Sequence, residues 1–220
     1  MKFKSPLVEI LLKEIKNPSK KKLICTGIEN EEPVKELAKH FRYVLSCYEF
    51  LKCRPGRKQN YCLKKEAPLY AIKKFPEFDV ILIMNEMHHF PDIYQLWTYK
   101  RLQKRQELIV VERGKAGSFE KIYVCFQNCN PLLGLAKKIM DQAVKQKIIK
   151  ITKKRSFKEE YLFESADDLK KFFKFILPDH WPFGKACLEK KLRKKKFPLR
   201  LHESEILYHI QKNADFVEKN

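Results

Sequence analysis

The chain has 220 residues, with 47 Lys or Arg against 27 Asp or Glu, and therefore carries a formal net charge of +20. Hydrophobic residues make up 44% of the sequence and include 16 Phe and 9 Tyr, an apolar content that disordered chains lack. No run approaches the ~18 apolar residues of a membrane span. The composition argues against a disordered or membrane-spanning chain and predicts one soluble domain, or one domain with an appendage.

The N-terminal segment predicts a first helix and a cellular location. Ser5 and Pro6 precede apolar residues at helical spacing, which predicts a short helix from about residue 7 to residue 15. The residues before this helix contain no apolar stretch of the kind that a secretory signal needs. We therefore expect an intracellular protein, located in the cytoplasm or in the nucleus.

Strands and helices then alternate along the chain. The segment Asp79–Met84 is apolar on both faces, which is typical of a strand in the middle of a parallel sheet. Strands that alternate with helices of about 10 to 15 residues predict an α/β fold, a doubly wound and mostly parallel sheet with helices on both faces. In chain order we expect strand 23–26, helix 32–41, strand 43–48, a weak strand 61–63, strand 79–84, helix 93–104, strand 107–111, helix 131–146, strand 147–152, helix 166–175 and an extended stretch 197–210.

The seven cysteines show no repeated spacing, and their number is odd. This usage is typical of reduced thiols inside a cell, which serve as small core residues. The alternative is a structural zinc site, but such a site normally has two close cysteine pairs, and none occurs here. We therefore predict no metal site. The cysteines considered as zinc ligands are Cys47, Cys53, Cys62, Cys125 and Cys129.

Five sequence blocks carry a resemblance to a known family. They lie on the expected strands and on the loops after them, where ligands bind in doubly wound sheets. The blocks are Leu23–Gly27, Lys35–Phe41, Phe78–Asn85, His88–Asp92 and Glu107–Gly114. Their order and separations resemble class I S-adenosylmethionine-dependent methyltransferases over about residues 20–175. The resemblance implies a Rossmann-like sheet, with an N-terminal helix in residues 1–19, a methyltransferase-like domain in residues 20–180 and a basic extension in residues 181–220 that completes the sheet.

The resemblance also implies a cofactor site at the carboxyl ends of these strands. The loop with Thr26 and Gly27 would cradle the methionine part of S-adenosylmethionine, because glycine lets the backbone approach a ligand closely. The other implied cofactor contacts are Tyr48 and Glu49 at the ribose, Glu66 and Ala67 at the adenine amine, and Asn85 beside the methyl donor.

Three positions of this implied site differ from the family pattern. The next two glycines of the loop fall near Glu29 and Glu31, and the acid at the end of the first strand falls on Cys25. We expect a crowded loop, whose two carboxylates repel the carboxylate of the cofactor and make its affinity weak or absent. The alternative is that residues 29–32 are only the acidic start of a helix, which the helix dipole favours.

Asn85, His88 and His89 are the candidate catalytic residues. Asn85 is a candidate through the resemblance. Because an imidazole titrates near neutrality, the two histidines could act as a general base pair. In the family that the chain resembles, this position is often a loop that closes over the cofactor, so a structural role for the histidines is the alternative.

Basic residues are clustered, which favours a polyanionic partner. Clustered cations displace the counterions of phosphates and bind nucleic acid without sequence preference. We expect nucleic acid, with RNA favoured over DNA. A protein partner, an anionic membrane surface and merely solvated lysines are the alternatives. The candidate contacts are Arg54, Arg57, Lys58, Lys153, Lys154, Arg155, Lys190, Lys191, Arg193, Lys194, Lys195 and Lys196.

Two functions remain open at this point. The first is transfer of a methyl group from S-adenosylmethionine to a nucleic acid or to a protein bound on one. The second is a catalytically inactive scaffold of the same fold, which binds RNA or a partner protein through its basic surface. The missing glycines favour the scaffold, whereas the blocks at residues 66–67, 85 and 88–92 favour the enzyme.

Overall fold

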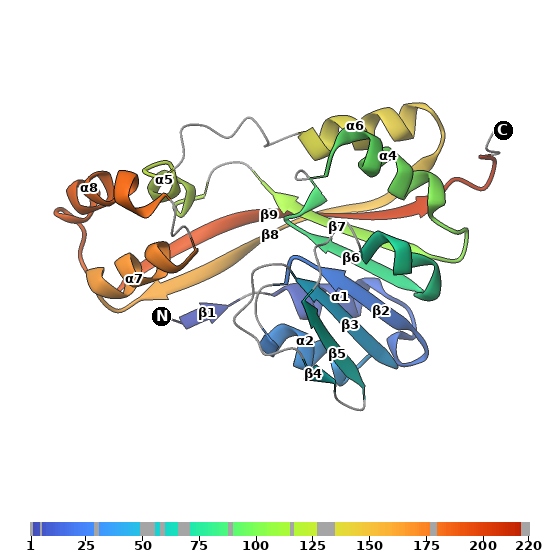
Figure 1. Ribbon diagram of the computed structural model, residues 1–220, viewed down its shortest axis with the longest axis horizontal. Coiled ribbons are helices and arrows are strands. Elements are labelled where there is room, and N and C mark those ends of the chain that lie inside the picture. The colour runs from blue at the N-terminus through green and yellow to red at the C-terminus, as the bar shows by residue number, and fades with distance from the viewer. Residues whose placement is uncertain are drawn as a thin grey trace. The chain divides into compact units, whose positions relative to one another are not determined.

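The computed structural model describes residues 2–4, 6–28, 31–48, 56–57, 60–65, 71–87, 90–114, 117–126, 135–176 and 180–216 (Figure 1). Packing divides the chain into two compact units. The larger unit comprises Leu7–Glu112, Leu132–Arg155 and Ile206–Asn220, and the smaller unit comprises Met1–Pro6, Arg113–Pro131 and Ser156–Glu205. These two units are defined by which residues pack together. The predicted division into segments 1–19, 20–180 and 181–220 is a division by function, and it stays a prediction.

The larger unit contains the expected α/β sheet. Parallel pairing links β2 (Lys22–Thr26) to β3 (Tyr43–Tyr48) and β6 (Val80–Met84), β3 to β5 (Tyr61–Lys65), and β6 to β7 (Glu107–Arg113). The strand order in this unit is β8-β9-β7-β6-β2-β3-β5-β4, where β4 (Gly56–Arg57) is antiparallel to β5. The predicted doubly wound, mostly parallel sheet is confirmed.

Helices cover the central strands because those strands are apolar on both faces. Ile81 and Ile83 of β6 share a buried core with Tyr99 of α4 and Met140 of α6, whereas Leu82 between them points to the opposite face of the sheet. On the side of β3 and β5, α2 packs against both strands. The helices of this unit are α1 (Leu7–Glu14), α2 (Glu31–Ala38), α4 (Asp92–Arg101) and α6 (Leu135–Lys145), with 3-10 turns at Pro18–Lys20 and Ile72–Glu77.

The smaller unit is built on the second half of β8 (Ile149–Phe163) and the first half of β9 (Leu199–Lys212). The arrows of these two strands run in opposite directions in Figure 1. The core of the unit is aromatic, since the ring of Phe119 stacks on Tyr161 at 4.8 Å and that of Phe126 stacks on Phe173 at 4.9 Å between centroids. Its other elements are β1 (Lys2–Lys4), which is antiparallel to β8, and the helices α5 (Glu120–Tyr123), α7 (Ala166–Ile176) and α8 (Trp181–Leu192).

Two elements of the smaller unit differ from the sequence prediction. The strand expected to end at residue 152 continues to Phe163, because its lysines face solvent while Phe157, Glu159 and Phe163 are buried. The segment 181–192 forms the helix α8 before β9 begins. Pro182 stands in its first turn, and residues Gly184, Leu188 and Leu192 bury one face at four-residue spacing.

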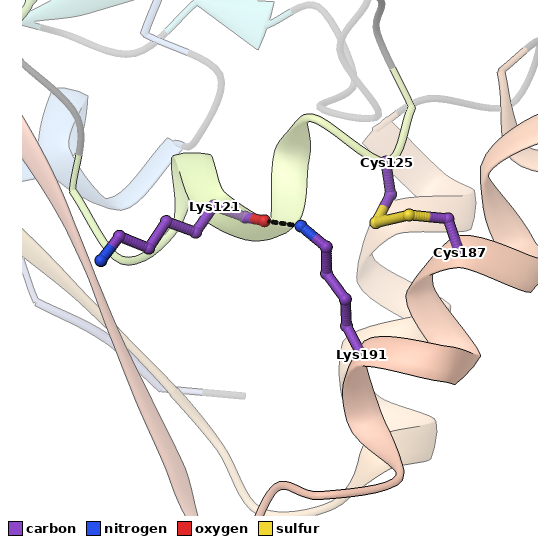
Figure 2. The surroundings of a disulfide bond; sticks show 4 residues. All are labelled: Lys121, Cys125, Cys187 and Lys191. Carbon is purple, nitrogen blue, oxygen red and sulfur yellow. Dashed lines mark hydrogen bonds between the residues drawn. A yellow bond between two sulfur atoms is a disulfide. The ribbon is translucent and has the colours of Figure 1, made fainter.

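The prediction that all cysteines are reduced is wrong for one pair. Cys125, which follows α5, forms a disulfide with Cys187 of α8, with 5.5 Å between their Cα atoms (Figure 2). Cys125 is therefore not available as the zinc ligand that the spacing left open. Cys25 and Cys47 are buried free thiols, as expected, and Cys62 is a half-buried one. Cys53 and Cys129 lie outside the described residues.

Candidate functional site

The strand order places a ligand-binding position between β2 and β6. From β2 the chain proceeds outward through β3 and β5, and it then returns to the other side of β2 with β6 and β7. Thr26, the last residue of β2, lies opposite Cys47 of β3 and Ile83 of β6. These strands therefore end at one common edge, the carboxyl edge, where open α/β sheets bind their ligands at the point of reversal.

The loop after β2 needs a glycine because another loop touches it. Gly27 has a φ of 76°, in the left-handed region that favours glycine. A Cβ at this position would overlap the carbonyl oxygen of Met84 and would lie 2.6 Å from Cγ of Glu86. The loops after β2 and β6 are thus in direct contact at the carboxyl edge.

The loop after β6 brings an amide and a carboxylate to the same place. Asn85 adopts a left-handed φ of 52°, which asparagine tolerates better than most residues, and its backbone N–H donates to the carbonyl oxygen of Val111 in β7 at 2.8 Å. Glu86 follows and lies over Gly27. Gly27, Asn85 and Glu86 are all half-buried, whereas the strand residues next to them, such as Thr26 and Ile83, are fully buried.

Cys25 cannot replace the acid that the family pattern has at the end of the first strand. Its side chain is fully buried, and its thiol lies 3.6 Å from the carbonyl oxygen of Leu45. Burial raises the pKa of this thiol to about 12, so it stays neutral. A carboxylate reaches the carboxyl edge from Glu86 instead, a residue that the sequence analysis did not select.

The start of α2 shows how one of the crowding carboxylates is held. The helix begins at Glu31 among the described residues, as predicted. The Glu31 carboxylate accepts a hydrogen bond from the hydroxyl of Tyr61 at 3.2 Å and lies 3.5 Å from Nζ of Lys35. Lys35 therefore offsets part of the charge that was expected to repel a cofactor. Glu29 lies outside the described residues.

The opposite edge of the larger unit is closed by contacts within the protein. Glu107, at the start of β7, is paired with Nζ of Lys21 and with Nε2 of His209 at 2.9 Å. Burial would raise the pKa of Glu107, but hydrogen bonds from His209 and Lys21 outweigh burial and hold that pKa below its usual value. The charged groups at this edge are therefore paired with one another. The carboxyl edge of the sheet remains as the candidate ligand site.

The structure brings together three of the sequence-predicted site residues, Thr26, Gly27 and Asn85. For Tyr48 it describes only the backbone, at the end of β3. The predicted residues outside the described part of the chain are Glu49, Glu66, Ala67, His88 and His89. The cofactor and catalytic roles of these five residues stay predictions.

The basic candidates at residues 153–155 lie in the larger unit, and those at residues 190–196 lie in the smaller unit. Lys153 and Arg155 pair with the buried carboxylate of Glu14, at 2.6 and 3.3 Å, and Nζ of Lys154 lies 5.6 Å from the ring centre of Tyr208. These contacts give the cluster of residues 153–155 a structural role in the larger unit. In the smaller unit the ammonium of Lys191 donates to the carbonyl oxygen of Lys121 (Figure 2).

The remaining basic candidates of the smaller unit are exposed and make no ion pair with any residue that the structure describes. They are Lys190, Arg193, Lys194, Lys195 and Lys196. Arg54 and Lys58 lie outside the described residues, and for Arg57 only the backbone is described.

Glu203 lies at the centre of an acidic cluster in the smaller unit. Its carboxylate pairs with Nε of Arg113 at 2.8 Å and accepts a hydrogen bond from the hydroxyl of Tyr161 at 3.2 Å. Glu159 and Glu205 are buried beside it, and one oxygen of each of the three carboxylates lies within 4.8 Å of the others. Burial, together with these carboxylates, raises the pKa of Tyr161. Arg113 thus places a positive charge beside the three carboxylates, and Tyr161 donates a hydrogen bond to one of them.

Comparison with solved structures identifies the fold. A SAM-dependent methyltransferase from Anabaena variabilis is 15% identical, with a TM-score of 0.51 over 94% of this chain and 83% of its own. The [4+2]-cyclase SpnF is 13% identical, with a TM-score of 0.56 over 94% of this chain and 80% of its own. The cyclopropane synthase MmaA2 from Mycobacterium tuberculosis is 10% identical, with a TM-score of 0.52 over 94% and 83%.

The chain has the fold of class I S-adenosylmethionine-dependent methyltransferases. No protein-family model matches its sequence, and no curated protein matches it. Because proteins with the names of a methyltransferase, a cyclase and a synthase share this fold, the fold leaves the reaction open. None of the described helices combines the length and the apolar character that a membrane crossing requires.

Proposed function

We propose that the protein binds S-adenosylmethionine at the carboxyl edge of its larger unit and transfers the methyl group to a nucleic acid, with RNA favoured. The supporting observation is that Gly27, Asn85 and Glu86 meet, half-buried, at the point where the strand order reverses. When bound, S-adenosylmethionine supplies an electrophilic methyl group on its sulfonium sulfur.

The residues at this edge suit the polar ends of that cofactor. Gly27 offers its backbone N–H and carbonyl groups at this edge, and the Asn85 side chain is of a type that can both donate and accept. Glu86 offers a carboxylate for an ammonium group, and a charged hydrogen bond of this kind is stronger than a neutral one. Gly27, Asn85 and Glu86 are therefore the residues that would hold the cofactor in the described part of the chain, whereas Thr26 is fully buried beneath them.

Glu86→Gln tests the cofactor site. We expect calorimetry to detect S-adenosylmethionine binding by the unmodified protein, weaker than micromolar because the loop lacks two glycines, and to show a further loss of about tenfold in E86Q. The control is Glu77→Gln, which removes the same charge from an exposed residue in the turn before β6. Asn85→Ala should abolish methyl transfer to RNA and leave RNA binding unchanged. Equal affinities of E86Q and the unmodified protein would contradict the assigned site.

A catalytically inactive scaffold of the same fold is the second candidate. It is favoured by Cys25, which places a neutral core thiol where the family pattern has an acid. No binding at millimolar S-adenosylmethionine, together with intact RNA binding, would establish the scaffold and overturn the enzyme.

Replacing Lys194, Lys195 and Lys196 by Ala tests the nucleic-acid partner. If each lysine neutralises one phosphate of a single strand, the slope of log affinity against log salt should become flatter by about 2, at about 0.7 per contact. The matched control replaces Lys16, Lys20 and Lys104, which are also exposed and make no ion pair with the described residues. An unchanged slope in the first variant, or equal changes in both, would remove the assigned partner site.

A further inference from the structure

Helix α8 has one face in the core and one face in solvent. Gly184, Leu188 and Leu192 are buried, and the ring of Trp181 stacks on Phe126 with 5.9 Å between centroids. These four residues pack on the core of the smaller unit. Phe183, in contrast, points outward with 84% of its surface exposed, more than the other exposed large hydrophobic residues among those described.

Three contacts fix α8 in place. Gly184 has no side chain, and a Cβ there would overlap the ring of Phe126, so helix and ring pack directly. The disulfide joins Cys187 to Cys125, and the ammonium of Lys191 donates to the carbonyl oxygen of Lys121 (Figure 2). Because the helix is held before any partner binds, a ligand on its outer face has little backbone left to order.

The exposed side of α8 that carries Phe183 also carries a cation. Lys190 is seven residues further along, so it lies on the same side of the helix as Phe183, about 10 Å away along the axis. Arg193 and Lys194, which follow the helix directly, are exposed as well, and none of these three cations makes an ion pair with a described residue. The helix dipole favours the cations of the last turn, but it does not account for the exposed ring of Phe183 in the first turn.

We propose that the outer face of α8 is a docking surface for single-stranded RNA, in which Phe183 stacks on a base and the cations further along the chain, Lys190, Arg193 and Lys194, contact the backbone phosphates. The inference rests on the proposed nucleic-acid partner and names the surface that binds it. An exposed aromatic ring beside unpaired cations is the combination that binds single strands without sequence preference. An acidic peptide could pair with the cations, but it has no base that would stack on Phe183. An RNA duplex is also a poorer partner, because its bases are stacked inside the helix and cannot reach the ring.

Phe183→Leu tests this surface in the full chain. The probe is a dye-labelled 12-mer of oligouridine, with its binding measured by fluorescence anisotropy over a salt series. We expect F183L to weaken binding roughly tenfold without changing the salt slope, because stacking releases no counterions. Phe183→Tyr should retain the affinity, since it keeps an aromatic ring. The matched control is Phe175→Leu, which changes another exposed phenylalanine of the same unit, on α7, and should be silent.

The other outcomes are distinguishable. Equal affinities of F183L and the unmodified protein for oligouridine would overturn the stacking surface. If the triple lysine variant still flattened the salt slope in that case, the proposal of a nucleic-acid partner would stand without this surface. Binding of polyglutamate as tight as that of oligouridine would identify an acidic protein as the partner and overturn the inference. Loss of binding in both F183L and F175L would show a general effect on the unit and would also count against it.

Discussion

Replacing Cys125 and Cys187 together by Ser is expected to lower the free energy of unfolding of the smaller unit by about 4 kcal/mol, the value that loop-closure entropy gives for a sequence separation of 62 residues. The disulfide ties α8 to the segment after α5, where Phe126 also packs against Gly184 and Trp181 of that helix. Hydrogen exchange of the α8 amides should report the loss directly, because local opening then needs less free energy.

The reduced form of the unmodified protein supplies the internal comparison. Treatment with a dithiol should accelerate exchange in α8 to the level of the double serine variant and should leave that variant unchanged. Cys62→Ser is the control, since Cys62 is a half-buried free thiol of β5, and we expect it to change stability by about 1 kcal/mol or less. Equal protection of α8 in the oxidised and reduced proteins would contradict the prediction.

The parallel sheet could be predicted because its strands are buried on both faces. A continuous apolar run such as Val80–Met84 admits few interpretations, and the helices between such runs have apolar residues at helical spacing. In the smaller unit the sequence predicted α7 and β9 to within two residues, but α8 and the second half of β8 gave no comparable signal. The second half of β8 is charged on its exposed face. Helix α8 has a proline in its first turn and continues into a lysine cluster, which resembles a basic tail in the sequence.

The candidate site could be predicted only in part, for a different reason. Gly27 and Asn85 stand at strand ends, and their types match what a strand-to-helix loop requires. Glu86 was missed because it matters through its contact with Gly27, which lies far earlier in the chain and becomes a neighbour only when β2 pairs with β6. The disulfide was missed for the same reason, since seven cysteines at irregular spacing do not indicate which two approach each other.

Gly27→Ala is expected to lower the free energy of unfolding of the larger unit by about 3 kcal/mol and to abolish binding of S-adenosylmethionine. A left-handed conformation costs an alanine about 1–2 kcal/mol, and forcing extra atoms into a packed site adds roughly as much again. The new methyl group would overlap the carbonyl oxygen of Met84, so the loops after β2 and β6 must separate. Asn85 and Glu86, which follow Met84 directly, then leave the positions in which they would hold the cofactor. Denaturant unfolding and calorimetry measure the two effects.

A double variant shows whether the backbone or the carboxylate sets the geometry of the site. In Gly27→Ala the nearest atom is a backbone oxygen of Met84, and Cγ of Glu86 is further away at 2.6 Å. Shortening Glu86 to Ala can therefore relieve only the lesser contact, and G27A/E86A should be about as unstable as G27A alone. Gly114→Ala is the matched control, because its Cβ would first meet the hydroxyl of Ser204, a side-chain atom that can rotate away. If E86A restored the stability of G27A, the two loops would touch through the Glu86 side chain, and the glycine would be required by that carboxylate and not by the approach of the two backbones.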